Sequence, residues 1–122
     1  MNTPIIFELA KLLKEKDFDI PVIYFYKNDG TKKSFKDKSN INFNYFHRNS
    51  TNAPTSAPTI AEVVMWLHDK HGIWIAPKKV MGMNKWFPQI YKGDDLIISE
   101  IITNSPTEAY LGAIDYTLKN LI

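Results

Sequence analysis

The stretch TIAEVVMWLHDKHGIWIAP, residues 59–77, has the pattern of one helix that runs directly into one strand. Thr59 and Glu62 have the spacing of a capping box, in which two side chains accept hydrogen bonds from backbone N–H groups at the helix start. Apolar residues then recur at the spacing of a buried helical face. They are Ile60, Val63, Val64 and Leu67. This periodicity predicts an amphipathic helix that begins after Thr59.

Single residues mark the end of this helix and the strand that follows. Gly72 comes after the last periodic turn, where a left-handed C-cap conformation favours a residue without a Cβ. Ile73, Trp74 and Ile75 then form a short apolar run, which ends at Pro77 because proline lacks the N–H of a strand ladder. We therefore expect this stretch, including Trp74, to belong to the core and not to a functional site.

Composition limits the class of protein. The chain has 122 residues, of which 44% are hydrophobic and 23% charged, values typical of one globular domain. It contains no cysteine, which excludes disulfides, thiolate catalysis and thiolate metal sites. No apolar run approaches the roughly 20 residues that a membrane-spanning helix needs. The net charge of +2 permits a nucleic-acid partner but does not require one.

Local signals divide the first half of the chain into a helix and a hairpin. Thr3 and Pro4 have the positions of a cap and a first helical residue, and the helix is expected to end near Lys16. Residues 22–27 and 41–47 are rich in β-branched and aromatic side chains and predict paired strands around a lysine-rich loop. Residues 48–58 predict an irregular surface connection. Neither half could easily bury its own faces, so we prefer one domain to a boundary there.

The second half is predicted to contain two more strands and a final helix. Residues 85–91 predict a strand that is an edge or is bulged, because Pro88 cannot donate to a ladder. Residues 96–103 form a nearly continuous apolar run, typical of a central strand. Ser105, Pro106 and Glu108 have the positions of a second capping box with proline at the first helical residue, so the last helix is expected to begin there.

These elements together predict an α+β protein. It is expected to be a two-layer sandwich of three helices on a mostly antiparallel sheet of about four to five strands. The predicted element order is α-β-β-α-β-β-β-α, and residues 1–122 are predicted to form a single domain. The strand order within the sheet stays open.

Three stretches of this chain resemble a known group of proteins: ELAKLLKEKDFDIP, the series from YFHRNS through APT to MWLHDKHGIWI, and EAYLGAIDYTLKNLI. The group consists of small uncharacterised proteins encoded by phages and mobile elements of Bacteroides-type gut bacteria. The resemblance covers most of the chain except residues 78–92. It implies a cytoplasmic protein of a bacterial host cell, associated with a phage or prophage, and it carries over no catalytic residue.

The histidine pair His68 and His71 is the candidate metal site. The two residues share a helical face, neutral imidazole is a good zinc or nickel ligand, and Asp69, Asp94 or Asp95 would supply a third group. The spacing lacks the four-residue separation and interior glutamate of HExxH. We therefore interpret both histidines as surface residues and predict no metal and no cofactor.

No group of residues has the pattern of a catalytic site. His47 would need Ser50, Ser56 or Glu62 as its partner, but no nucleophile elbow or glycine-rich oxyanion loop accompanies them. Glu100 lies within an apolar run, and we expect it on a wet face or paired with a lysine. We predict that the protein is not an enzyme, and a small hydrolase or metal-binding protein is the third alternative.

A basic cluster on the predicted hairpin favours nucleic acid as one partner class. Its residues are Lys27, Lys32, Lys33, Lys36, Lys38 and Arg48, interleaved with Tyr24, Tyr26, Phe35 and Phe46. Cations that neutralise phosphates and rings that stack on bases are what single-strand binding needs. A lysine-rich hairpin tip is also an ordinary solvated loop that discourages edge pairing.

Aromatic residues outside the helical stripe favour another protein as the partner. Trp66 lies beside the apolar stripe of its helix, and Trp86 and Phe87 lie in the strand that contains Pro88. Aromatic side chains with one wet side are enriched at protein interfaces. We predict a non-catalytic accessory protein that binds another protein through Trp66, Trp86 and Phe87. A single-stranded nucleic-acid-binding factor is the alternative, and the oligomeric state stays open.

Overall fold

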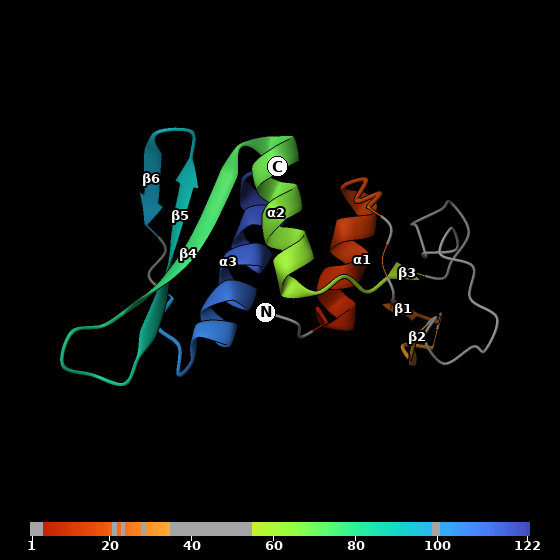
Figure 1. The fold of residues 1–122 in the computed structure, drawn as a ribbon, viewed down its shortest axis with the longest axis horizontal. Helices are drawn as coiled ribbons and strands as arrows, with labels where there is room; N and C mark the ends of the chain where they lie inside the picture. The colour runs from red at the N-terminus through yellow and green to blue at the C-terminus, as the bar shows by residue number, and fades with distance from the viewer. Residues whose placement is uncertain (1–3, 21, 23, 28, 35–54, 99–100) are drawn as a thin grey trace. The chain divides into compact units, whose positions relative to one another are not determined.

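The computed structural model describes residues 4–20, 22, 24–27, 29–34, 55–98 and 101–122. This part of the chain contains three helices and two three-stranded antiparallel sheets, which confirms the α+β class (Figure 1). The element order is α-β-β-β-α-β-β-β-α, one strand more than predicted, and the strands form two sheets where one was expected. The chain divides into two compact units, residues 2–59 and 60–122. Each unit is described by itself, and a single domain stays a prediction.

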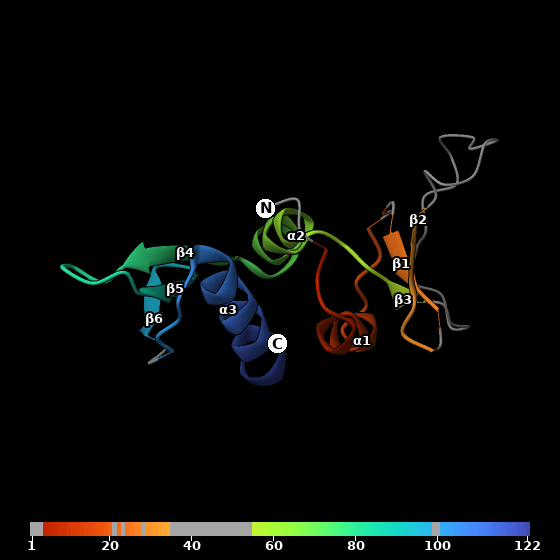
Figure 2. The ribbon, with the colours of Figure 1, turned by 90° about the horizontal axis from the view of Figure 1, so that it is seen from below.

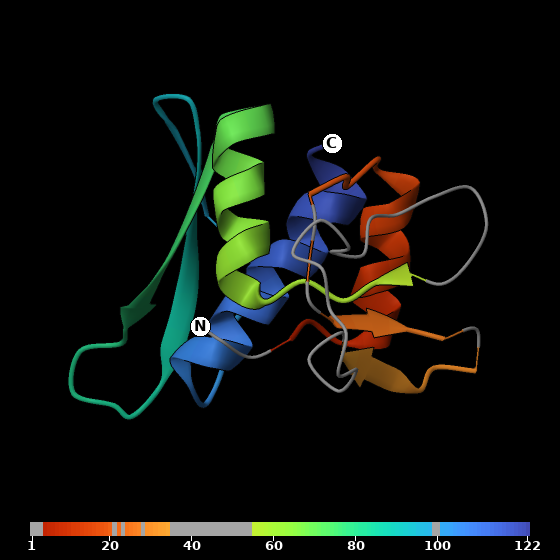
Figure 3. The same cartoon turned by 45° about the vertical axis from the view of Figure 1, so that its right-hand side comes forward.

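The unit of residues 2–59 contains one helix and a small sheet. Its elements are α1 (Phe7–Glu15), β1 (Tyr24–Tyr26), β2 (Lys32–Ser34) and β3 (Thr55–Ser56), with strand order β2-β1-β3. Helix α1 lies against β3 (Figure 3). The buried apolar side chains of this unit are Ile5, Leu9, Ala10, Leu13, Phe18, Val22, Tyr26 and Ala57. The hydroxyl of Tyr26 donates to the Ile5 carbonyl at 2.7 Å and so ties the sheet to the residues before α1.

Two local predictions for this unit are wrong. The first helix begins at Phe7, not after Thr3, because Pro4 forms a bridge with Thr59 and the Ile5 N–H donates to Pro58. Ile5 is consequently fully buried, whereas Ile6 is 51% exposed.

Strand pairing in this unit also differs from the predicted hairpin. Strand β1 pairs with residues 32–34, which the sequence pattern placed in a loop, and with β3, which lies in the segment predicted to be irregular. Both pairings depend on segments that carry no strong strand pattern of their own. The predicted return strand at residues 41–47 lies outside the described residues.

The unit of residues 60–122 has a sheet with two helices on one face. Its elements are α2 (Ile60–His71), β4 (Ile73–Lys79), β5 (Trp86–Lys92), β6 (Asp95–Ile98) and α3 (Pro106–Asn120). The strand order is β4-β5-β6, and α2 and α3 pack on the same side of the sheet (Figure 2). The buried apolar side chains are Ile60, Val63, Val64, Trp66, Leu67, Ile73, Ile75, Ile90, Ala109, Ala113, Ile114 and Leu118. The predicted bounds of α2 are confirmed, and Gly72 has the expected positive φ of 67°.

The central strand of this sheet is β5, so of the two alternatives predicted for the strand that contains Pro88, an edge strand or a bulged strand, the edge strand is wrong. Two successive hairpins, β4–β5 and β5–β6, necessarily place the shared strand in the middle. On β5, Gln89 pairs with Ile98, and Trp86, three residues before Gln89, pairs with Thr103. Ile98 and Thr103 are five residues apart, so the two pairs do not share one register. The N–H and C=O of Trp86 both bond to Thr103, so the nitrogen of Pro88, two residues on, points to that same side and away from β4. The missing N–H of proline therefore costs the β4–β5 ladder no bond.

Strand β6 is an edge strand among the described strands, which corrects the central position predicted for residues 96–103. Helix α3 begins as predicted, with the Glu108 N–H donating to the Ser105 hydroxyl at 3.1 Å and Pro106 at the first helical position. A Glu108 carboxylate oxygen accepts from the Asn104 N–H at 3.0 Å, which completes the reciprocal cap one residue before Ser105.

Candidate functional site

The strands β4, β5 and β6 present one face to the helices and one face away from them. Successive side chains of a strand point to opposite faces, and paired residues share a face. Ile75 pairs with Ile90, and both are buried beneath the helices. Trp74 pairs with Tyr91, and Tyr91 pairs with Leu96, so these three side chains lie on the opposite face. We call this the outer face; its described side chains are Trp74, Ala76, Lys78, Phe87, Gln89, Tyr91 and Leu96.

The outer face is apolar although water reaches it. Trp74 is 42% exposed and Leu96 is 45% exposed, Tyr91 between them is half-buried, and so is Phe87 nearer the β4–β5 hairpin. Both helices of this unit lie on the inner face, so no described helix of residues 60–122 covers the outer one (Figures 1 and 2). A sheet with one covered face normally carries polar residues on the other face. This sheet therefore has apolar surface beyond what its own core requires.

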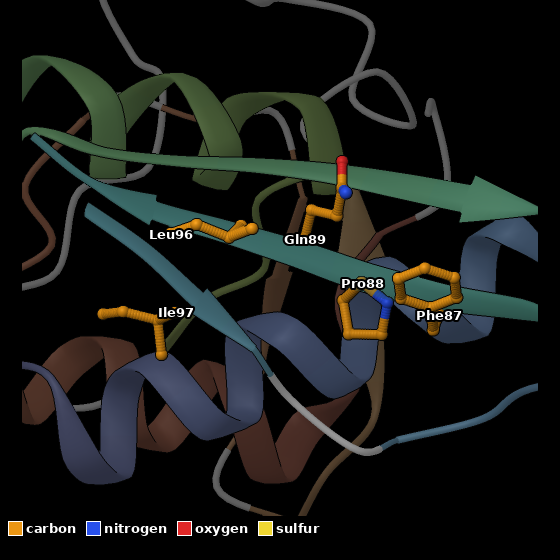
Figure 4. Close-up of a pocket in the computed structure, with 5 residues that line it drawn as sticks. All are labelled: Phe87, Pro88, Gln89, Leu96 and Ile97. Atoms are coloured by element: carbon orange, nitrogen blue, oxygen red, sulfur yellow. The ribbon is translucent and has the colours of Figure 1, made fainter. Parts of the chain in front are cut away.

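A pocket opens between β5 and β6 beside Pro88. It has a volume of about 230 Å³ and is lined by Phe87, Pro88, Gln89, Leu96 and Ile97 (Figure 4). Phe87, Gln89 and Leu96 belong to the outer face, whereas Pro88 and Ile97 belong to the inner face. Four of the five lining residues are apolar, so the pocket suits an apolar group.

His68 supports Trp74 at one end of the outer face. The two rings meet edge to face, with 5.4 Å between centroids and 82° between planes. The Nδ1 of His68 lies 3.1 Å from a carboxylate oxygen of Asp69. This contact joins the indole ring on β4 to the last turn of α2, which limits the orientations that an exposed tryptophan would otherwise sample.

Charged residues lie at both ends of the sheet, and the register places Lys78 on the outer face but Lys79 and Asp95 on the inner face. Lys78, Lys79 and Lys85 lie at the β4–β5 hairpin, and the methionines at its tip, Met81 and Met83, are 97% and 55% exposed. The carboxylates Asp94 and Asp95 lie at the opposite end, in and after the β5–β6 turn. The apolar centre of the outer face thus lies between a cationic hairpin and an anionic turn.

The structure places the three predicted protein-binding residues differently from one another. Trp66 is only 4% exposed and packs edge-on against His71, with 4.9 Å between ring centroids. Trp86 and Phe87 are adjacent in β5 and therefore face opposite sides of the sheet. Only Phe87 lies on the outer face and lines the pocket.

Trp74 is the residue of this site that the sequence analysis assigned to the core. The signal that would have found it is the alternation within Ile73-Trp74-Ile75. Two isoleucines that share the buried face of a strand place the residue between them on the other face. The prediction treats residues 73–75 as one buried apolar run and takes no account of this alternation.

The two histidines of the candidate metal site contact different neighbours. His68 contacts Trp74 and Asp69, whereas the ring of His71 packs against Trp66. Burial, reinforced by the positive charges of Lys70 and Lys92, lowers the pKa of His71 below its ordinary value. The described residues contain no group of three or more histidine or carboxylate side chains arranged to hold a metal ion.

The residues of the predicted nucleic-acid site are only partly described. Lys27, Lys32 and Lys33 are exposed, and the Lys32 ammonium lies 5.7 Å from the centre of the Tyr24 ring. Tyr26 is buried and donates its hydroxyl to Ile5, and burial raises its pKa. Its ring is therefore not exposed for stacking. Lys36, Lys38, Arg48, Phe35 and Phe46 lie outside the described residues.

The catalytic alternatives are likewise only partly visible. Ser56 is fully buried in β3, which separates its hydroxyl from solvent. Glu62 lies in the first turn of α2. His47, Ser50 and Glu100 lie outside the described residues.

Comparison with known proteins adds no family to this description. No family model, no curated protein and no solved structure matches the chain. Association with a phage or prophage stays a prediction from the resemblance. Among the helices of the described residues, none is both long enough and apolar enough to cross a membrane.

Proposed function

We propose that this protein is a non-catalytic binding module that recognises another protein through the outer face of the β4–β5–β6 sheet. The observation that carries the proposal is an uncovered sheet face on which Trp74 and Leu96 are more than two-fifths exposed. Exposing such side chains to water has a cost in free energy, and covering them on binding recovers it. Apolar patches of this kind on soluble proteins commonly mark interaction sites.

The chemistry of the face favours a protein as its ligand. Aromatic residues are enriched at the centres of protein interfaces, and one buried anchor side chain often carries much of the binding energy. The pocket of about 230 Å³ is smaller than the roughly 300–1,000 Å³ typical of small-molecule sites. It is the size of a receptor for one apolar side chain, and Trp74 and Tyr91 flank it on the same face.

The proposal can be tested without knowing the natural partner. A displayed library of random peptides would be selected on the whole protein, and each enriched peptide would then be measured on a Trp74→Ser/Leu96→Ser variant. We expect affinity to fall at least about 30-fold, because truncating interface hot spots costs about 2 kcal/mol or more. Circular dichroism and urea unfolding of the variant would verify that its fold is intact.

A control variant removes exposed apolar surface outside the outer face. Met65 lies on α2 and is 48% exposed, so Met65→Ser reduces surface hydrophobicity outside the outer face. Enriched peptides should bind this variant like the wild type. Peptides that bind all three proteins equally, or a selection that enriches none, would contradict the outer face as a protein-binding site.

A further inference from the structure

We infer that the partner segment that binds the outer face is acidic, with carboxylates that lie beside the cationic hairpin of residues 78–85. This inference rests on the proposed function and adds to it the chemical class of the partner. Three lysines at one hairpin end carry the argument, and the register places one of them, Lys78, on the outer face beside the apolar pocket. An apolar anchor would enter the pocket, and the carboxylates next to it would pair with the hairpin.

Lys78 is the lysine that the strand register places closest to the pocket. It is paired with Phe87 across β4 and β5, so the two side chains are direct neighbours on the outer face, and Phe87 lines the pocket. Cross-strand neighbours of this kind have Cβ atoms about 5 Å apart. A chain anchored in the pocket therefore passes within reach of the Lys78 ammonium group.

Lys79 and Lys85 extend the positive charge to the rest of the hairpin end. The Val80 N–H donates to the Lys85 carbonyl at 2.8 Å, which closes the loop and keeps the two lysines near each other. The Lys85 ammonium donates to the Asn104 side-chain oxygen, a neutral acceptor that leaves its charge uncompensated. Among the described residues, no carboxylate forms a salt bridge with any of the three lysines. The hairpin thus offers cations that a partner's carboxylates would complement.

The distribution of charge also orients the bound segment. From the residue opposite Lys78 to the residue opposite Asp95, strand β5 advances five residues, which is about 17 Å of extended chain. A segment with its acidic residues at the hairpin end avoids Asp94 in the turn at the other end. The opposite orientation would place like charges together, which costs affinity.

The library selection described above, repeated at low salt with two charge variants, tests this inference. Enriched peptides should carry a net negative charge around an aromatic or aliphatic residue. A Lys78→Gln/Lys79→Gln variant should bind them about tenfold more weakly than the wild type, and physiological salt should remove most of that difference. Lys70→Gln/Lys119→Gln is the matched control, with the same change in net charge on the two helices of the same unit. It should bind like the wild type.

The possible failures are separable. In one outcome, binding of the enriched peptides requires Trp74 and Leu96, but the peptides carry no excess of acidic residues and bind the Lys78/Lys79 variant like the wild type. This outcome would overturn the acidic partner and leave the proposed function standing. Peptides whose affinity is unchanged in the Trp74→Ser/Leu96→Ser variant would overturn both the acidic partner and the proposed function. An oligothymidylate strand would be titrated in parallel. If it binds at physiological salt and needs both Trp74 and Lys78, the ligand is a nucleic acid and the acidic protein segment is wrong.

Discussion

Two tryptophan–histidine pairs involve the end of α2, and their tryptophans lie on the two sides of the β4–β5–β6 sheet. Trp66 and His71 meet at 4.9 Å and 76° on the helix side, whereas Trp74 and His68 meet at 5.4 Å and 82° with Trp74 on the outer face. The residue types and the edge-to-face geometry are nearly the same. The two pairs differ in the burial of the tryptophan, because Trp66 is 4% exposed and Trp74 is 42% exposed.

This difference in burial shows that the same kind of aromatic contact contributes differently according to where it lies in the fold. Around Trp66, the helix packs on the sheet, and the buried ring contributes to stability. Around Trp74, no described helix of the unit covers the ring, so the same kind of contact orients an exposed side chain instead. We expect substitutions in the first pair to change unfolding and substitutions in the second to change binding.

The largest expected effect separates the two tryptophans directly. Trp66→Ala should lower the free energy of unfolding by about 3–5 kcal/mol, because it leaves a large cavity under the helix. Trp74→Ala should lower it by less than about 1 kcal/mol, because much of the ring is already in water. Urea unfolding monitored by circular dichroism measures both variants. Equal losses would mean that the outer face is covered in the folded protein.

A smaller effect is expected at Gly72, between α2 and β4. Its φ of 67° lies in the left-handed region, and an added Cβ would meet no atom within 4 Å. Gly72→Ala should therefore cost about 1–2 kcal/mol through the backbone alone. Gly72→Asn should cost less, because asparagine adopts this conformation more readily. If both variants are as stable as the wild type, the turn that directs Ile73 inward and Trp74 outward is not fixed by Gly72.

The smallest expected effect is a pH dependence from His71. Burial disfavours its charged form and lowers its pKa, so the unfolded chain binds the proton more readily than the folded one. The stability from neutral His71 is complete above its ordinary value of 6.5 and is lost as pH falls through the lower folded value. Unfolding measured between about pH 7.5 and pH 5 should therefore depend less on pH in His71→Gln than in the wild type. The same dependence in both proteins would contradict a desolvated ring.

The site itself was only partly predictable. The sequence pattern selected Phe87, which lines the pocket, but it also selected Trp66, which is buried, and passed over Trp74. Trp66 lies beside the stripe of Ile60, Val63, Val64 and Leu67, and α2 packs on both β4 and α3, so more of its circumference is buried than the stripe predicts. The alternation around Trp74 was present in the sequence, but only the register with Tyr91 and Leu96 shows that three strands share this apolar face.

The sequence by itself determined the elements whose signals are local. Helix α2 ends before Gly72 and α3 begins after Ser105, because caps and helical hydrogen bonds join residues only a few positions apart. The tertiary structure alone decided which strand is central, why Pro88 is tolerated there, and which tryptophan is exposed. Strand pairing and burial depend on residues far along the chain, and Thr103 beside Trp86 is one of them. No pattern within a few residues of Pro88 carries that information, and the alternation around Trp74 shows which face it occupies but not that no described helix of the unit covers that face.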